Sequence, residues 1–514
     1  MSEEQFLFSD AGAQVAGLAM AGRPLRDLVG EISRLYTEDD RPWVIGYSGG
    51  KDSTTCVQLI FTALAALPVE QLKKPVYVVS SNTLVETPLV IDLIKTTLEE
   101  LETGAEASNL PMSVHQVVPK ANNSFWVNLL GRGYPAPTKA FRWCTERMKI
   151  DPVSDFIKAK VAEFGEVVVV LGSRSQESAT RAQVIAKHRI DGSLLSRHTS
   201  LSNAYVYMPI EDWSADEVWE YLMSAPRPWS GDNQELLELY RGSNAGECPV
   251  VIDTSTPSCG NSRFGCWTCT VVTTDKAMES LVEQGEDWMR PLLDFRNLLA
   301  ETTLPENKST FRNHRRRTGR VTYARGDLED DSDGAKARKH IPGPYWLKYR
   351  QEWLRKLLEI ESQLSDAGRP IELITREELH LIRREWLNDP NEPDWEDNLP
   401  GIYQQVYGES LDWIEHDGGL ISARDAHLLG DLSKAHGVPD GLTQKLIELE
   451  ITMDGLSRRR GLMDRIDRLL SLDWESLDDV KERHAKAAED LGHLDDELLE
   501  LEQEAEALTN RGTA

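Results

Sequence analysis

The chain has 514 residues, of which 40% are hydrophobic and 28% are charged, and these proportions are ordinary for a globular protein with at least one large core. Its formal net charge of −28 excludes a surface that coats nucleic acid indiscriminately, although a local basic patch remains compatible with binding. No apolar run approaches the roughly 20 residues of a membrane span, and the acidic start of the sequence is unlike a secretory signal, so we expect a cytoplasmic protein without a membrane partner.

Residues 43–171 have the pattern of an α/β fold. Short apolar runs predict strands at 43–47, 75–79, 113–118 and 167–171, and helical apolar spacing predicts helices at 54–67, 89–101 and 150–164. Continuous β-branched strands that alternate with helices predict a parallel sheet with helices on both faces. Ligands of such sheets bind at the carboxyl ends of the strands.

A glycine-containing segment connects the first predicted strand to the first predicted helix. It consists of Ser48, Gly49, Gly50, Lys51, Asp52 and Ser53. The glycines let the backbone turn closely around an anion, and the following helix presents free N–H groups and the positive end of its dipole. Lys51 would supply positive charge to phosphates, and Asp52 would hold Mg²⁺ or orient the segment. We therefore expect a phosphate-binding loop; its spacing is too short for the GxxxxGK[ST] loop.

The fourth predicted strand is followed by Gly172, Arg174 and Glu177. Because parallel strands end at one edge of the sheet, Arg174 is expected to project into the same cleft as the phosphate loop. The alternative is that Arg174 and Glu177 form a surface ion pair.

Six cysteines are too few for a disulfide scaffold in a chain of this length. Four of them lie within 22 residues, in a segment rich in glycine and serine: Cys248, Cys259, Cys266 and Cys269. Four thiolates suit an iron–sulfur cluster or Zn²⁺, and because only one CxxC pair occurs we favour iron–sulfur over zinc or unligated thiols. Cys56, on the helix after the loop, is expected to be a small buried hydrophobe.

Cys144 has a different setting. Arg142, Arg147 and Lys149 flank it, and these charges are expected to lower the pKa of its thiol and favour the thiolate. A nucleophilic or sulfur-handling role is therefore predicted for Cys144, with a structural role as the alternative.

The segment 301–345 carries basic runs and the acidic run 327–331, and we expect it to be flexible. The candidates for contact with a DNA backbone are Arg312, Arg315, Arg316, Arg317 and Arg320, with His314, Lys336, Arg338 and Lys339 nearby. The alternative is a solvated loop that pairs with the acidic run or with an acidic partner protein.

The sequence from 346 onward predicts helices. Leucines and other apolar residues recur in steps of three and four at 442–456 and again at 477–508, with a break at 471–474. This spacing predicts a coiled-coil-like helical hairpin, which either packs internally or docks a partner protein.

Several of these segments resemble known enzymes. The loop at 48–53 resembles SGGxDS of the PP-loop ATP pyrophosphatases, an adenine nucleotide α-hydrolase-like fold. Residues 172–181 resemble the GxRxxESxxR element of phosphoadenylyl-sulfate reductases, 209–219 resemble their PIxDWSxxDVW segment, and 142–149 resemble their basic cysteine-containing element. The resemblance implies that the loop, Gly172, Arg174 and Glu177 bind ATP, and that Lys51 and Asp52 are catalytic.

The sequence departs from those reductases in two ways: no cysteine follows Cys269, and the single Cys144 stands where iron–sulfur reductases have a pair. Redox transfer to a sulfonucleotide is therefore not expected.

The order of loop, cysteine-rich segment, basic segment and helical tail resembles the DndC family of DNA phosphorothioation proteins. That resemblance implies sulfur incorporation into the DNA backbone, with ATP, Mg²⁺ and a [4Fe–4S] cluster as cofactors. It also implies a cysteine desulfurase and other Dnd proteins as partners. The alternatives are a tRNA or small-molecule thiolase, a sulfate-assimilation reductase and a non-enzymatic assembly subunit.

The expected domains are the PP-loop ATP pyrophosphatase domain at 1–240, an iron–sulfur region at 241–300, the flexible segment at 301–345, a helical region at 346–440 and the hairpin at 441–514.

Overall fold

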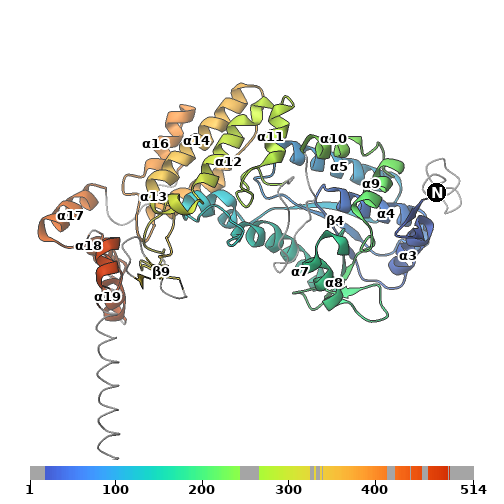
Figure 1. Cartoon of the computed structure of the whole chain (residues 1–514), viewed down its shortest axis with the longest axis horizontal. Helices are drawn as coiled ribbons and strands as arrows, with labels where there is room; N and C mark the ends of the chain where they lie inside the picture. The colour runs from blue at the N-terminus through green and yellow to red at the C-terminus, as the bar shows by residue number, and fades with distance from the viewer. Residues whose placement is uncertain are drawn as a thin grey trace, which may run out of the picture. The chain divides into compact units, whose positions relative to one another are not determined.

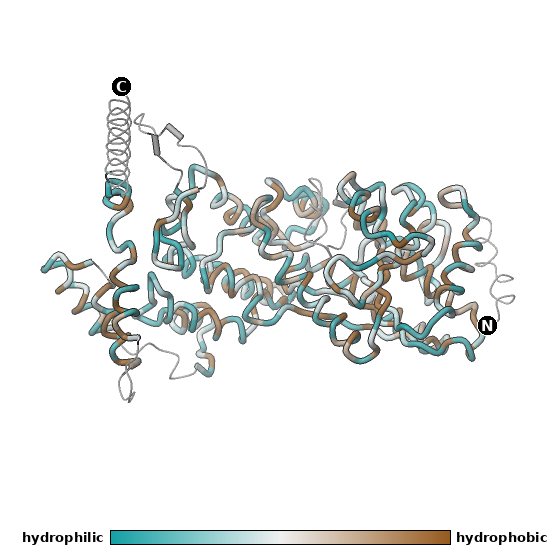
Figure 2. Tube along the Cα trace, turned by 90° about the horizontal axis from the view of Figure 1, so that it is seen from below, coloured by the Kyte–Doolittle hydropathy of each residue, from teal (hydrophilic) through white to brown (hydrophobic). Residues whose placement is uncertain are grey.

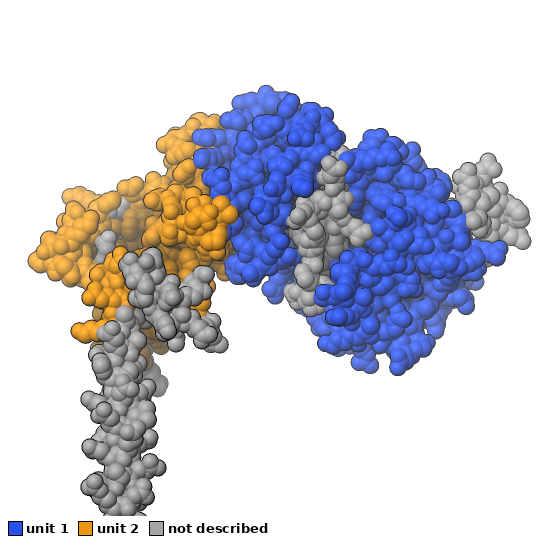
Figure 3. Space-filling model, viewed as in Figure 1, with its two compact units in different colours: residues 1–128, 136–303, 356–379 blue, residues 129–135, 304–355, 380–514 orange. Residues whose placement is uncertain are grey.

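The computed structural model describes residues 18–243, 265–324, 329–330, 336–337, 340–413, 423–439, 441–453, 461–483 and 486. The chain divides into two compact units, shown in blue and orange in Figure 3. Unit 1 comprises residues 1–128, 136–303 and 356–379, and unit 2 comprises residues 129–135, 304–355 and 380–514. Each unit is described separately below.

Unit 1 is built on a central sheet, near the label β4 in Figure 1. The sheet has six strands in the order β5-β4-β3-β6-β8-β7. Its strands are β3 (Trp43–Tyr47), β4 (Val76–Ser81), β5 (Met112–Val117), β6 (Val167–Val170), β7 (Ser196–Arg197) and β8 (Ala204–Tyr207). All neighbours are parallel except β7, which pairs with β8 in the antiparallel direction. The predicted α/β fold is confirmed. β7 and β8 were not among the predicted strands; β7 has only two residues, and the sequence AYVY of β8 lacks the continuous β-branched run of β6.

Helices cover both faces of this sheet, as predicted. Alternate residues of β3 point to opposite faces. Trp43 and Ile45 belong to one core, with residues of the helices α3, α4, α5 and α9, whereas Val44 belongs to a second core with Ile157 of α7. The polar loop that follows β3 therefore begins from a strand that is fixed on both sides.

The helices of unit 1 are short and mostly amphipathic, and several alternate between brown and teal along their turns in Figure 2. Their bounds are α3 (Leu25–Thr37), α4 (Lys51–Ala65), α5 (Pro88–Ala107), α6 (Trp143–Thr145), α7 (Asp151–Phe164), α8 (Ala179–His188), α9 (Ala215–Ser224), α10 (Gln234–Ser243), α11 (Lys276–Glu283) and α12 (Arg290–Glu301). A small hairpin, β1 (Ala19–Met20) and β2 (Arg23–Pro24), precedes α3. α4 is buried along nearly its whole length, and it begins directly after the loop.

Unit 2 is helical, which confirms the predicted helical C-terminal region. Its elements are α13 (Lys308–Phe311), α16 (Asn398–Tyr407), α17 (Ala423–His436), α18 (Leu442–Met453), α19 (Leu462–Leu470) and the short pair β9 (Glu329–Asp330) and β10 (Lys336–Ala337). Two further helices, α14 (Leu347–Asp366) and α15 (Arg376–Leu387), have residues in both units. Arg350, in the part of α14 that belongs to unit 2, forms a buried ion pair at 3.0 Å with Asp389, which follows α15.

The predicted helical tail is described only in part. α18 and α19 pack against each other, and helix resumes at 477 after a break that includes the predicted turn at 471–474. α19 lies within the predicted first arm of the hairpin, between the apolar segment at 442–456 and the predicted turn at 471–474. Residues 487–514, which carry most of the predicted second helix, lie outside the described residues. None of the helices in the described part of the chain is both long and apolar enough to cross a membrane.

Candidate functional site

The phosphate loop lies between the end of β3 and the first turn of α4. Gly49 has φ +73°, and a Cβ atom there would lie 2.5 Å from Cγ1 of Ile94, so both backbone angle and space require glycine. The Ser48 N–H donates to Oγ of Ser53 at 3.2 Å, and that hydroxyl donates to the carbonyl of Gly50 at 2.9 Å. The loop is therefore closed on itself at the N-terminus of a helix, where backbone N–H groups favour an anion.

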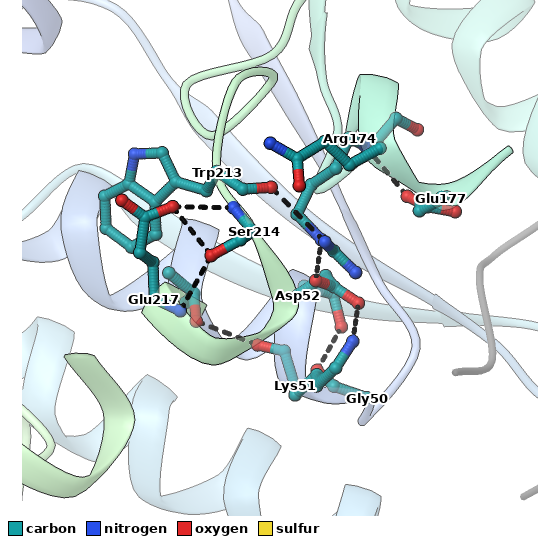
Figure 4. Close-up of polar contacts among 12 residues, drawn as sticks. Gly50, Lys51, Asp52, Arg174, Glu177, Trp213, Ser214 and Glu217 are labelled. Atoms are coloured by element: carbon teal, nitrogen blue, oxygen red, sulfur yellow. Dashed lines mark hydrogen bonds and ion pairs between the residues drawn. The ribbon is translucent and has the colours of Figure 1, made fainter. Parts of the chain in front are cut away.

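Asp52 lies between two cations at the start of α4 (Figure 4). Its Oδ2 is 2.8 Å from Nζ of Lys51, and its Oδ1 is 2.6 Å from Nε of Arg174. Arg174 and Lys51 are only 1% and 2% exposed. The structure thus brings together three of the predicted site residues, from the loop after β3 and the loop after β6. Both carboxylate oxygens of Asp52 are engaged, so phosphates would compete with Asp52 for Lys51.

Gly172 sits where the end of β6 meets the first turn of α4. A Cβ atom at this position would lie 2.7 Å from the backbone carbon and oxygen of Asp52, so a larger residue would push the two segments apart. Gly172 therefore sets the close approach that lets Arg174 reach Asp52.

Glu177 supports this arrangement from the backbone side. Its Oε1 accepts the N–H of Arg174 at 2.8 Å, and its Oε2 is 3.1 Å from Nη1 of Arg181. Burial raises the pKa of Glu177 above its ordinary value, although Arg181 opposes the shift. The predicted surface pair between Arg174 and Glu177 does not describe this contact, because Arg174 turns its guanidinium inward to Asp52.

Two further residues contact the site and were not predicted to do so. The hydroxyl of Tyr240 accepts the N–H of Lys51 at 3.3 Å, and its ring packs edge-to-face on Trp219 with centroids 5.0 Å apart. The carbonyl of Trp213 accepts Nη1 of Arg174 at 3.3 Å. Trp213 lies in the segment that resembles the reductases, whereas nothing in the sequence distinguishes Tyr240 from an ordinary apolar position of a helix.

The Cys266–Cys269 segment is hydrogen-bonded to the connection between β4 and α5. Glu86 and Cys266 form an antiparallel bridge, and backbone N–H groups of Thr87 and Trp267 donate to residues across it at 2.8 and 2.9 Å. The Cys266 thiol lies 3.3 Å from Oγ1 of Thr83. Glu86 accepts that hydroxyl at 3.0 Å and lies 3.3 Å from Nζ of Lys149.

Cys144 lies within electrostatic range of this segment. Burial raises the pKa of the Cys144 thiol to about 11, and the nearby Cys269 raises it further, while Lys149 acts in the opposite direction. The expectation that basic neighbours would lower this pKa is therefore wrong, because loss of hydration outweighs the one cation close enough to matter. Burial also raises the pKa of Cys266. Cys56 is fully buried in α4, which confirms its predicted packing role.

Thiolates are chemically suited to bind a soft metal, but the structure describes only some of the predicted cysteine ligands. Cys248 and Cys259 lie outside the described residues. Within the described ranges, no three metal-binding side chains converge closely enough to hold an ion. Cys266 and Cys269, beside the buried Trp267, fit as part of a thiolate set for an iron–sulfur cluster.

The predicted basic patch belongs to unit 2, and its side chains have diverse partners. Arg312 donates to the carbonyls of Gly343 and Pro342, and Arg317 donates to Glu385 at 3.2 Å. The guanidinium of Arg315 lies 5.8 Å from the ring centroid of Trp474. Arg316 is exposed and donates to the Pro342 carbonyl at 3.3 Å. Arg320 is also exposed and donates to the Ser471 hydroxyl at 3.2 Å. The side chains of 325–339, including the acidic run, Lys336, Arg338 and Lys339, lie outside the described residues.

Known proteins resemble parts of the chain. An uncharacterized protein of Methanocaldococcus jannaschii is 28% identical over 205 residues, which is 40% of this chain and 36% of that relative. A phosphoadenylyl-sulfate reductase from Candida auris, in a phosphate complex, is similar at TM-score 0.27 and 16% identity, over 43% of this chain and 93% of that one. The U34-tRNA thiolase NcsA of Methanococcus maripaludis, with its [4Fe–4S] cluster, is similar at TM-score 0.24 and 12% identity, over 54% of this chain and 79% of that one. Residues 42–272, which include the phosphate loop, Arg174 and the Cys266–Cys269 segment, match the family model of the phosphoadenosine phosphosulfate reductase domain.

Proposed function

We propose that this chain is an ATP pyrophosphatase that adenylylates a DNA backbone phosphate, so that sulfur can replace one of its non-bridging oxygens. One observation carries the proposal: a phosphate loop and a thiol segment follow neighbouring strands of one sheet. β3 and β4 are parallel and in register, with Tyr47 opposite Ser80. The loop begins directly after Tyr47, and the Cys266 segment is fastened to the connection that follows β4. The phosphate loop and the Cys266–Cys269 segment therefore lie after neighbouring strands at the carboxyl edge of the sheet, which supports the proposal.

In the first step, an oxygen of the DNA phosphodiester attacks the α-phosphorus of ATP. The bond between the α-phosphorus and the bridging oxygen to the β-phosphorus breaks, and pyrophosphate leaves. The N–H groups at the start of α4 and the ammonium of Lys51 hold the departing phosphates, and Arg174 stays oriented by Asp52. Mg²⁺, when bound to the triphosphate, neutralises part of its charge.

In the second step, hydrosulfide or its equivalent attacks the activated DNA phosphorus, and AMP leaves with the oxygen that it acquired. A cysteine desulfurase is the proposed sulfur source. It supplies a persulfide, so a second thiol must attack the inner sulfur, form a disulfide and release hydrosulfide. The other Dnd proteins are the proposed partners. A [4Fe–4S] cluster held by Cys248, Cys259, Cys266 and Cys269 would supply a soft, sulfur-rich metal centre.

The test compares nucleic acids from cells that contain the gene, lack it, or carry Asp52→Asn. Enzymatic digests of the DNA are examined by mass spectrometry for phosphorothioate dinucleotides, and digests of the tRNA for thionucleosides. We expect the DNA phosphorothioates to disappear in the second and third strains while tRNA thiolation persists. Loss of tRNA thionucleosides with intact DNA would assign the chain as a tRNA thiolase, and a requirement for growth on sulfate with neither loss would assign a reductase.

A further inference from the structure

Phe141 is unusual for its exposure. Among the aromatic side chains of the described residues, only Phe141 and Phe164 are classed as exposed, at 46% and 41%. A single exposed hydrophobic residue needs no explanation on its own. The surroundings of Phe141, however, differ from those of Phe164.

Phe141 is held outward by a rigid turn. Its backbone N–H donates to the carbonyl of Thr138, and the N–H of Thr138 donates to the carbonyl of Phe141, both at 3.1 Å. Lys139 and Ala140 form the exposed tip of this turn. Two residues further along, Trp143 is buried and stacks on Phe125 with centroids 5.5 Å apart and 23° between the planes. The backbone on both sides of Phe141 is thus held in place, and its ring is exposed.

The turn lies beside the thiol segment. The hydroxyl of Thr270 donates to the carbonyl of Pro137 at 2.7 Å, and these two residues directly follow Cys269 and directly precede Thr138. On the other side of Cys144, the hydroxyl of Ser81 at the end of β4 donates to the carbonyl of Met148 at 3.2 Å. The turn that carries Phe141 is therefore hydrogen-bonded, through Pro137, to the residue that follows Cys269.

The local charge also differs from that of the whole chain. Between residues 139 and 149 the sequence has four basic side chains and one carboxylate, in a chain of net charge −28. An exposed aromatic ring next to basic side chains is how proteins hold single-stranded nucleic acid: the base stacks on the ring, and the cations attract its phosphates. A duplex offers no free base face for such stacking.

We propose that the turn Thr138–Phe141 is a contact for unpaired DNA, in which Phe141 stacks on a base and Lys139 attracts the adjoining phosphate. The contact would hold the backbone beside Cys144 and Cys269. This inference rests on the proposed function and specifies the form of its substrate, a locally unpaired strand.

The test uses the full-length protein and an oligonucleotide that contains 2-aminopurine, whose fluorescence is quenched by stacking. We expect wild-type protein to bind the single strand more tightly than the duplex and to quench the label. Phe141→Ala should weaken binding about tenfold and abolish the quenching, whereas Phe141→Tyr should retain both. Lys139→Gln should reduce the slope of log K against log salt by about 0.7, the value for one phosphate of a single strand.

Phe164→Ala is the matched control. Phe164 ends α7, just before β6 begins, and so lies at the opposite edge of the sheet from the carboxyl ends of the strands. Its removal should leave DNA affinity and ATP cleavage unchanged, and thermal unfolding of each variant shows whether the fold is intact.

Equal affinity and quenching for wild type and Phe141→Ala would overturn the inference and leave the proposed function standing. If wild-type protein binds RNA and fails to bind DNA in either form, the proposed function fails as well.

Discussion

The phosphate loop and the thiol segment lie after neighbouring strands, yet they are assembled in different ways. The loop is local: six consecutive residues provide its turn, its hydroxyls and one of its cations, and the second cation, Arg174, comes from the loop after β6. The thiol segment joins distant pieces of chain, from 83–86, 144–149 and 266–269. A short motif therefore suffices to recognise the first site, whereas recognising the second requires the tertiary fold.

The sharpest test of the local site is replacement of Asp52 or Lys51. Asp52→Asn keeps the size of the side chain but removes the charge that orients Arg174 and Lys51. We expect ATP cleavage to fall by about 10²–10³-fold or more, because these groups act on the charge of the departing phosphates. Lys51→Ala should have at least as large an effect. The measurement is the rate of AMP and pyrophosphate formation with Mg²⁺; ADP and phosphate as the products would refute the mechanism.

The assembled site is tested by iron content. Protein purified anaerobically is expected to be brown, with about four iron and four sulfide per chain. Cys266→Ser and Cys269→Ser should remove the colour and the iron, because both thiols are proposed ligands of the cluster. Cys56→Ser is the matched control, since Cys56 is buried in α4 and should leave the iron in place. Stoichiometric zinc without iron would reverse the assignment of the metal.

Cys144 offers a pH-dependent measurement in the metal-free protein. With a folded pKa of about 11 against an ordinary value of 9.0, its thiolate at pH 8 should be roughly a hundredfold scarcer than that of an unfolded chain. Alkylation of Cys144 should therefore be slow in the folded state and accelerate up to about pH 11. The same shift should lower the free energy of unfolding as pH rises from 9 to 11, because Cys144 ionises at lower pH in the unfolded chain than in the folded protein. Rapid alkylation of folded protein at pH 7 would show that the pKa of Cys144 is not raised.

The smallest effects are expected in the basic patch of unit 2. Arg312→Gln should lower the free energy of unfolding by about 1–3 kcal/mol, because two backbone carbonyls lose their donor. Arg316→Gln together with Arg320→Gln should change stability by less than about 0.5 kcal/mol per residue and reduce the salt dependence of DNA binding. Denaturant unfolding and a salt titration measure the two quantities. If salt dependence is unchanged while a partner protein no longer co-purifies, the patch is a docking site.

The sequence allowed the first four strands of the sheet and the helices α4, α5 and α7 to be predicted, but not the other helices of unit 1. Strands β3, β4, β5 and β6 follow from apolar runs. β8 is as short as β6, but its sequence AYVY lacks the continuous valines of β6, and β7 has only two residues. The residues of the loop, Gly172 and Arg174 were identified by motif. The pKa of Cys144 was predicted in the wrong direction, since charged neighbours are visible in a sequence and burial is not. Tyr240 was missed for a related reason: only the fold reveals which atom its hydroxyl meets.

That hydroxyl has a consequence for how the loop is filled. Tyr240 presents an oxygen to the Lys51 N–H, which is what a phosphate would present to the same group. A nucleotide phosphate that accepts this N–H would displace the tyrosine hydroxyl. Tyr240 belongs to α10, and its ring packs on Trp219 of α9. Nucleotide binding at the loop would thereby be coupled to α10, which lies some 190 residues along the chain and precedes the segment that carries Cys248 and Cys259.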